Sequence, residues 1–172
     1  MTGVVEEIYV TSEGSAAMER AEEVYAVERR AIGRRSLGRR SLGRRSVERG
    51  GIEGDRYREE TGYWTLYGDI CEVTLIEGEG LDEIERNDGL RVKNGEHRRN
   101  IITRGIRLEN LRRKKFRIGE AVLEYDRPRP PCKHVQDLTQ PGMTRALRGR
   151  GGICARVVEG GRIRARDEIV PL

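Results

Sequence analysis

The apolar residues of this chain fall in short alternating or β-branched runs, and glycine-rich turns separate these runs. Runs of this kind are typical of β-strands rather than of long amphipathic helices. The expected strands are Val4–Val10, Glu72–Glu77, Phe116–Ile118 followed by Ala121–Tyr125, and Cys154–Val158 followed by residues 162–166. The Gly160-Gly161 pair between the last two runs predicts a β-hairpin. Strands with regular turn signals predict a mainly β fold, closed or nearly closed into an antiparallel barrel.

Helical patterns are few and short. Residues 79–85 and 144–148 each predict a short helix. Residues 15–27 favour a helix on propensity, but Val24-Tyr25-Ala26-Val27 fits a strand equally well, so the sequence leaves both structures open there. We therefore expect a compact β-barrel with a few short helices.

The composition agrees with a β-rich fold of modest size. The 172 residues are about enough for one domain, and 22 glycines imply many turns. The N-terminal residues lack the pattern of a secretory leader, and no apolar run approaches the length that spans a membrane. We therefore expect a single domain over residues 1–172 that is soluble and cytoplasmic, with no membrane contact.

A five-residue repeat in four copies covers residues 29–48, and each copy begins with two arginines. A period of five matches neither the α-helix nor the β-strand, so the repeat cannot bury a continuous face. Residues 31–49 hold seven arginines and a single acid, Glu48, which leaves the rest of the chain close to neutral despite a net charge of +5. The segment is either a solvated loop inserted into the fold or a basic arm that contacts phosphates.

The three cysteines, Cys71, Cys132 and Cys154, are widely spaced and form no CxxC pair. This spacing excludes a zinc knuckle and argues against a secreted disulfide scaffold. Cys132 stands out because it follows three prolines within Arg127-Pro-Arg-Pro-Pro-Cys-Lys-His134, where proline stiffens the backbone and basic groups can stabilise a thiolate. A lone cysteine is also often a small buried hydrophobic residue, and the octapeptide alone leaves that alternative open.

Three further segments are too irregular to be only scaffold. Gly50–Tyr57 combines glycines with Asp55 and Arg56 at a tight bend. Residues 98–106 carry Arg98 and Asn100, which would share one face of a strand and can bind phosphate or carboxylate. Residues 148–152 (Arg-Gly-Arg-Gly-Gly) can expose backbone N–H groups to an anion. His97, which precedes the second segment, is expected to be a solvated loop residue rather than a ligand.

These segments follow one another in a specific order: Gly-Ile-Glu-Gly-Asp-Arg-Tyr from residue 51, Arg-Arg-Asn-Ile-Ile-Thr-Arg-Gly-Ile from residue 98, Pro-Pro-Cys from residue 130, and Gly-Arg-Gly-Gly-Ile-Cys-Ala-Arg-Val from residue 149. In this order and spacing the chain resembles the MOSC domain family, named for the C-terminal domain of molybdenum cofactor sulfurases. The resemblance runs from about Gly51 to Ile169. It implies a compact MOSC-type β-barrel, a cytoplasmic protein of bacterial type, and an association with the molybdenum cofactor (molybdopterin). At family level it also carries an association with pyridoxal phosphate binding.

The resemblance implies a role for Cys132 in particular. The family's characteristic cysteine is proposed to carry sulfur as a persulfide, and in relatives that reduce N-hydroxylated compounds it ligates molybdenum. Arg98 and Asn100 match positions similar to cofactor contacts of those reductases. The remaining cofactor-binding residues that we expect by this resemblance are Asp55, Thr103, Arg150 and His134, with Arg98 and the Gly149–Gly152 loop together holding the pterin phosphate.

The sequence is therefore compatible with three functions. The favoured one is a persulfide sulfur carrier for metal–sulfur centres, whose partners are the pterin cofactor or a sulfur donor or acceptor protein such as a cysteine desulfurase. The second is a small molybdenum-dependent reductase with Cys132 as the metal ligand. The third is a nucleic-acid-binding or interaction module that uses the arginine-rich arm, although few aromatic residues are available to stack on bases. The repeat at 31–49 is an insertion where relatives have a short connection, and Arg166-Asp167 stands near the C-terminus where relatives usually have Gly-Asp.

Overall fold

The computed structural model of the protein describes residues 1–31 and 47–172. The elements of these residues are, in order, β1 (Gly3–Val10), β2 (Glu19–Ala21), β3 (Glu23–Val27), β4 (Arg30–Ala31), β5 (Val47–Glu48), β6 (Gly51–Ile52), the 3₁₀ helix η1 (Tyr63–Tyr67), β7 (Val73–Glu77), α1 (Gly78–Asp88), β8 (Ile101–Arg104), the 3₁₀ helix η2 (Leu108–Leu111), β9 (Lys115–Ile118), β10 (Ala121–Pro128), α2 (Lys133–Leu138), α3 (Met143–Ala146), β11 (Ile153–Glu159), β12 (Gly161–Arg164) and β13 (Glu168–Pro171). The expected mainly β fold with a few short helices is confirmed.

Seven of the described strands close into a barrel in the order β1-β13-β9-β10-β11-β7-β8, and β2 extends the sheet beyond β1. The closing contact joins Gly3 of β1 to Ile169 of β13. All neighbouring strands of the barrel are antiparallel except β7 and β8, which are parallel because α1 connects them as a crossover. Closure pairs the strand edges with one another, which removes the unpaired backbone groups of an open sheet.

The strands of the barrel alternate between two apolar layers, as the period of two in a strand requires. On β7, Val73 and Leu75 point into the barrel, where they pack with Phe116, Leu123 and other aliphatic side chains. Ile76 points outward instead and packs beneath α1, α2 and α3, with Leu81, Ile84, Val135, Met143 and Leu147. Two cores, one inside the barrel and one under its helices, therefore share the same strands.

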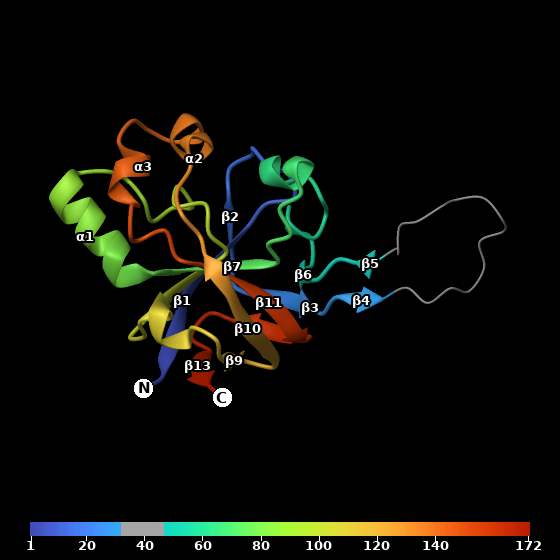
Figure 1. Ribbon diagram of the computed structural model, residues 1–172. Helices are drawn as coiled ribbons and strands as arrows, with labels where there is room; N and C mark the ends of the chain where they lie inside the picture. Colours follow the sequence, from blue (N-terminus) through green and yellow to red (C-terminus); the bar gives the residue numbers. More distant parts are fainter. Residues whose placement is uncertain (32–46) are drawn as a thin grey trace, which may run out of the picture.

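The helices α1, α2 and α3 gather at one end of the barrel, and both chain termini lie at the other end (Figure 1). Cys132 is the N-cap residue of α2 and ends the four-residue connection from β10, so it lies at the helical end of the barrel. The helix α2 itself was not expected from the sequence, because the proline-rich approach masks its short apolar pattern. The short helices expected near residues 79–85 and 144–148 are present as α1 and α3.

The predicted hairpin of residues 154–166 is wrong. β11 and β12 follow each other in the chain, but β12 pairs with β3 and joins a separate three-stranded sheet, β12-β3-β6. The chain turns away after Gly160 because β11 already has β10 and β7 as its two neighbours in the barrel. The same sheet settles the alternatives for residues 15–27 in favour of strands, since Val24–Ala26 lies opposite Gly161–Ile163.

The arginine-rich repeat lies mostly outside the described residues. Its flanks form the two-stranded ribbon β4–β5, in which Arg30 pairs with Glu48 (Figure 1). The proposed solvated loop or basic arm at 31–49 therefore stays a prediction.

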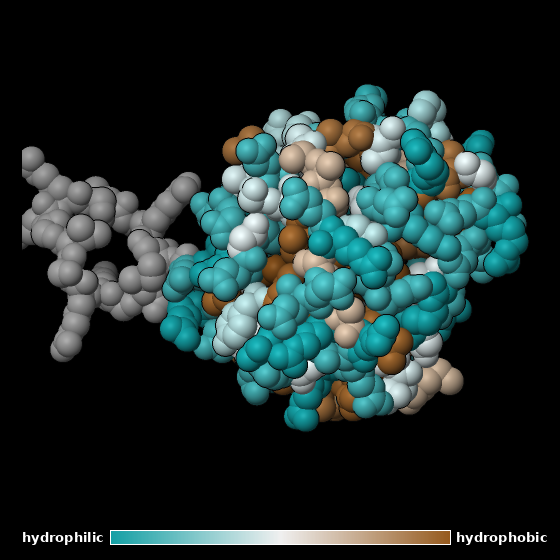
Figure 2. Space-filling model, turned by 180° about the vertical axis from the view of Figure 1, so that it is seen from behind, coloured by the Kyte–Doolittle hydropathy of each residue, from teal (hydrophilic) through white to brown (hydrophobic). Residues whose placement is uncertain are grey.

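The outer surface is mostly hydrophilic, with apolar side chains scattered among charged ones on the face in Figure 2. This agrees with the high charged fraction of the sequence, 37%. Across residues 1–31 and 47–172, no helix is both long and apolar enough to cross a membrane.

Candidate functional site

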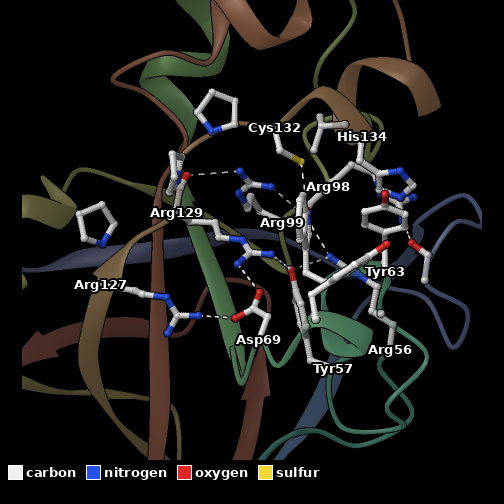
Figure 3. A pocket seen from close by; sticks show the side chains of 18 of the residues that line it. Arg56, Tyr57, Tyr63, Asp69, Arg98, Arg99, Arg127, Arg129, Cys132 and His134 are labelled. Atoms are coloured by element: carbon white, nitrogen blue, oxygen red, sulfur yellow. Dashed lines mark hydrogen bonds and ion pairs between the residues drawn. The ribbon is translucent and has the colours of Figure 1, made fainter.

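A cavity of about 770 Å³ lies at the helical end of the barrel and is lined by Cys132. Its other lining residues are Gly14, Arg56, Tyr57, Gly62, Tyr63, Trp64, Tyr67, Gly68, Asp69, Arg98, Arg99, Arg127, Pro128, Arg129, Pro130, Pro131, His134 and Val135. Figure 3 shows Cys132 and the arginine side chains meeting in this space, with Tyr63 and His134 together on one side. The cavity therefore combines one thiol, a group of guanidinium ions and a group of aromatic rings.

The backbone before Cys132 is fixed by the glycine-rich loop that follows α3. The N–H of Arg129 donates to the Gly152 carbonyl at 2.8 Å. A Cβ at position 151 would lie 2.2 Å from the Arg129 carbonyl oxygen, so this close approach requires a glycine. Cys132 itself is half-buried, and the indole N–H of Trp64 points to its sulfur at 3.4 Å. The thiol is thus attached to a constrained backbone, and the Trp64 N–H is a hydrogen-bond donor to its sulfur.

One carboxylate organises the arginines on the Cys132 side. Asp69 forms ion pairs with Arg127 and with Arg129, the latter at 2.5 Å. Burial alone would raise the pKa of Asp69, but the hydrogen bond and charge of Arg129, together with Arg127, hold that pKa below its usual value. Arg56 and Arg129 also lie near the ring of Tyr57, at 4.4 Å and 5.7 Å from its centroid. Asp69 therefore stays ionised and orients Arg129 toward the cavity.

Two further guanidinium groups have no carboxylate partner among the described residues. Arg99 is almost fully buried and donates only to carbonyl oxygens, including that of Gly151 at 2.8 Å. Arg98 adopts a left-handed backbone (φ 60°) and donates to the carbonyls of Gly14, at 2.8 Å, and Ala16. Burial, and secondarily the charge of Arg56, lowers the pKa of Arg98 to about 10, so the group is still cationic at neutral pH. Buried charges are normally paired, so these two guanidinium groups could compensate the charge of an anion in the cavity.

Aromatic side chains from η1 form the other wall. The rings of Tyr63, Trp64 and Tyr67 contact one another with centroids 5.1 to 5.7 Å apart. His134 stacks on Tyr63 at 3.9 Å, and its Nε2 lies 3.5 Å from the Ser15 hydroxyl. Burial, and secondarily the charge of Arg98, lowers the pKa of His134, so the imidazole is neutral at pH 7.

The structure separates the predicted site residues into those that line the cavity, those buried behind it, and two, Thr103 and Arg150, that lie elsewhere. Cys132, Arg98 and His134 line the cavity together. Asn100 and Asp55 are fully buried behind it and bond to each other at 3.0 Å. Arg98 and Asn100 do not share a strand face, because Arg98 occupies a left-handed bend and β8 begins only at Ile101.

The buried Asn100–Asp55 pair acts on the cavity through its neighbours. Asn100 also receives bonds from the backbone and hydroxyl of Thr74, at 3.1 and 2.9 Å. Asp55 accepts from Arg56 at 3.3 Å and from the Tyr57 N–H at 3.2 Å. Burial raises the pKa of Asp55, against the opposing charge of Arg56. The pair therefore positions Arg56 and Tyr57, which do line the cavity.

Thr103 and Arg150 lie away from this cavity. Thr103 is buried on β8 and donates to the Ile76 carbonyl at 3.3 Å. Arg150 is exposed, pairs with Glu83 at 2.9 Å, and lines a second cavity of about 720 Å³ together with Gly149 and Gly152. The structure therefore does not bring Arg98 and the Gly149–Gly152 loop together around one cavity. Within the loop, Gly151 and Gly152 lie against the carbonyl oxygens of Arg129 and Leu75.

The prediction that His97 is solvated is also wrong. The ring is fully buried, its Nδ1 accepts from the Arg99 N–H at 2.9 Å, and its Nε2 has no hydrogen-bond partner among the described residues. Burial, with the charges of Arg99, Arg56 and Arg98, lowers its pKa to about 3. A neutral histidine therefore supports the backbone that presents Arg98 and Arg99.

The family profile of the MOSC domain matches residues 62–170, which include Cys132 and most of the cavity. The chain belongs to the MOSC domain family. This family is associated with the molybdenum cofactor. No curated protein sequence matches the chain significantly.

Solved MOSC-family proteins have the same fold at low sequence identity. YuaD from Bacillus subtilis superimposes with a TM-score of 0.71 at 18% identity, covering 98% of this chain and 94% of YuaD. YiiM from Geobacillus stearothermophilus gives 0.67 at 14% identity, with 100% of this chain and 75% of that one covered. YiiM from Escherichia coli gives 0.64 at 18% identity, with 100% and 70% covered.

Sequence reasoning missed several lining residues of this MOSC cavity, above all Tyr63, Trp64 and Tyr67. The available signal was their clustering, since three of the eight aromatic residues of the chain fall within five positions. Arg99 lies within the motif that begins at residue 98, but Asp69 carried no signal, because single charged residues are common on any surface. In residues 1–31 and 47–172, no three His, Cys, Asp or Glu side chains converge as a metal site. Among the lining residues, Cys132, His134 and Asp69 are of types that could each ligate a metal brought by a cofactor.

Proposed function

We propose that this MOSC protein carries sulfur as a persulfide on Cys132 and delivers it to a metal–sulfur centre of the molybdenum cofactor. One observation supports the proposal best: the Cys132 thiol opens into a cavity with five guanidinium groups and one lining carboxylate. A thiolate and a persulfide are both anions, and cationic surroundings stabilise them. The Trp64 N–H, 3.4 Å from the sulfur, adds a donor.

The loading step needs only the thiolate and a sulfane sulfur. Neutral His134 lines the same cavity and would be available to accept a proton there. The Cys132 sulfur attacks the outer sulfur of a donor persulfide, a new S–S bond forms, and the donor S–S bond breaks to release the donor thiolate. In delivery a nucleophilic atom of the acceptor attacks the outer sulfur, a new bond to that sulfur forms, and the S–S bond breaks with its electron pair staying on Cys132 as a thiolate. The sulfur is thus passed on as sulfane sulfur, and this step consumes no oxidant or reductant.

The residues of the cavity fit an anionic, planar cofactor. Arg98 and Arg99, which have carbonyl partners only, would hold its phosphate through charge-assisted hydrogen bonds. The rings of Tyr63 and Trp64 would pack against a flat heterocycle. When bound, such a cofactor supplies the metal that takes up sulfur, and the protein supplies the thiol, the cations and a partly water-shielded cavity.

A second candidate is a reductase in which Cys132 ligates molybdenum. The uncompensated charge of Arg98 and Arg99 favours it, because a resident anionic cofactor would neutralise that charge permanently rather than transiently. Soft thiolate ligation suits metal–sulfur chemistry. The two candidates differ in whether the Cys132 sulfur bonds to another sulfur or to the metal.

Anaerobic purification separates the candidates. The protein is analysed for molybdenum and pterin, then incubated with inorganic polysulfide, alkylated and analysed by peptide mass spectrometry. The sulfur-carrier function requires one added sulfur on the Cys132 peptide and none in Cys132→Ser, which retains Cys71 and Cys154. Stoichiometric molybdenum without a persulfide would favour the reductase, and the absence of both contradicts the two candidates together.

The anion site has its own matched test. Arg98→Met should weaken binding of the pterin cofactor at least tenfold, because the variant removes a buried cation. The control is Arg162→Met, which removes an exposed cation of β12 that pairs with Glu120. This variant should leave binding of the cofactor unchanged. Equal affinities of the two variants would show that Arg98 is not part of the site.

A further inference from the structure

An exposed apolar ridge borders the Cys132 cavity. It consists of Tyr63, Trp64, Leu66, Tyr67 and Ile70, and it contains five of the nine large hydrophobic residues that are exposed in the described chain. No residue of η1 is buried. Contiguous exposed apolar surface of this kind marks an interaction site, whereas scattered exposed side chains do not.

The ridge extends beyond what a ligand in the cavity could cover. Tyr63, Trp64 and Tyr67 line the cavity, but Leu66 and Ile70 do not. Leu66 is 82% exposed and Tyr67 is 70% exposed. A small molecule seated next to Cys132 would leave Leu66 and Ile70 in water, so the occupant of the whole ridge must be larger.

The area of the ridge matches part of a protein interface. Weighted by their exposed fractions, its five side chains offer roughly 500 Å² of accessible surface. A stable protein–protein interface covers ~800 Å² on each partner. The ridge and the rim of the cavity next to it are therefore of the right size for one protein partner.

The ridge is also preformed. Its three rings pack against one another, and η1 ends at Gly68, whose left-handed backbone lets its N–H bond to the Thr65 carbonyl. The N–H of Asp69 then donates to the Trp64 carbonyl at 3.0 Å. Preformed Trp and Tyr side chains lose little entropy on docking and are the residue types that dominate interface energies.

Electrostatics identifies the kind of partner. A segment that follows the ridge to Cys132 reaches a cavity whose lining has five guanidinium groups and one carboxylate, that of Asp69. Acidic side chains on that segment would compensate these charges, and basic ones would be repelled. The favoured partner therefore presents acidic residues around its reactive group.

We infer that the apolar ridge docks a partner protein that exchanges sulfur with Cys132 through a cysteine on an acidic loop. The inference rests on the proposed sulfur-carrier function and names its partner class and docking surface. In the exchange, a thiolate attacks the outer sulfur of the opposing persulfide, one S–S bond forms as the other breaks, and the released thiolate keeps the electron pair. No oxidant or reductant is consumed.

The partner is captured by replacing Leu66 with the photo-crosslinking residue p-benzoylphenylalanine in the native host. The matched control carries the same residue at Tyr25, an exposed position on β3 outside the cavity lining. The expected product is a crosslink at position 66, absent at position 25, to a different protein, at a segment with a cysteine and several acids. A crosslink only to a second copy of this chain, or none at position 66, overturns the inference.

Transfer is then measured with the captured protein after purification. Leu66→Glu should lower the rate of sulfur exchange with the partner at least tenfold, because it places a charge in the ridge and repels an acidic segment. Loading of Cys132 by inorganic polysulfide should stay unchanged in this variant. Exchange within twofold of the wild-type rate contradicts the docking surface alone, whereas failure of polysulfide to load the wild type contradicts the proposed function.

Discussion

His97 gives the protein a specific sensitivity to acid. Its ring is fully buried, and its neighbours Arg99, Arg56 and Arg98 are all cationic, so protonation inside the fold is strongly disfavoured. In the unfolded chain the ring has its usual pKa of 6.5, whereas in the fold the pKa falls to about 3. Between these values the unfolded state binds one proton more than the folded state, so stability decreases as the pH falls.

The magnitude follows from the size of this shift. Each pH unit below 6.5 costs about 1.4 kcal/mol until the folded pKa is reached, so lowering the pH from 7.5 to 4.5 should remove ~2.5 kcal/mol. At pH 3 the loss would approach ~5 kcal/mol, which is a large part of the stability of a typical domain. Measurement at pH 4.5 keeps the protein folded enough for a reliable transition.

The matched variant is His97→Asn. Its side-chain oxygen can replace Nδ1 as the acceptor of the Arg99 N–H, and it does not titrate. Urea unfolding of both proteins at pH 7.5 and 4.5, at constant ionic strength, gives four free energies of unfolding. Other titrating groups affect both proteins alike, so the difference between the two pH dependences isolates His97. If both proteins lose stability equally between the two pH values, His97 is not a neutral buried histidine and the reasoning fails.

Two further predictions concern thiols and glycines. A thiol reagent such as DTNB should modify Cys132 rapidly in the native protein, and should modify buried Cys71 and Cys154 only after unfolding; rapid modification of all three would contradict this assignment. Gly152→Ala should destabilise the fold by more than ~3 kcal/mol in thermal or urea unfolding, because the added Cβ would lie 1.9 Å from the Leu75 carbonyl oxygen at a φ of 82°. Gly54→Ala, at a φ of 75° with no atom within 4 Å, should cost only about 1–2 kcal/mol, and equal losses would rule out the steric contribution.

Much of the barrel could be predicted from local sequence. The runs at Val4–Val10, Glu72–Glu77 and Ala121–Tyr125 are strands because β-branched and aliphatic residues alternate there between two packed layers. The pairing of those strands could not be predicted in the same way. The Gly160-Gly161 signal correctly marked the break between β11 and β12, but the partner of β12 was β3, more than 130 residues earlier in the chain.

The sequence by itself determined which cysteine is the candidate and that a proline-rich backbone precedes it. Three prolines before Cys132 and the ordered MOSC motifs singled out this cysteine as the candidate reactive residue, since proline geometry and motif order are local or linear properties. Only the tertiary structure decided what surrounds it. It placed Arg98 at the cavity and Asn100 behind it, moved Arg150 to another cavity, buried His97, and brought Trp64 to the sulfur. The burial, charge balance and contacts of a side chain depend on which segments of the chain lie next to one another in space. In this protein the strand order of the closed barrel decides that.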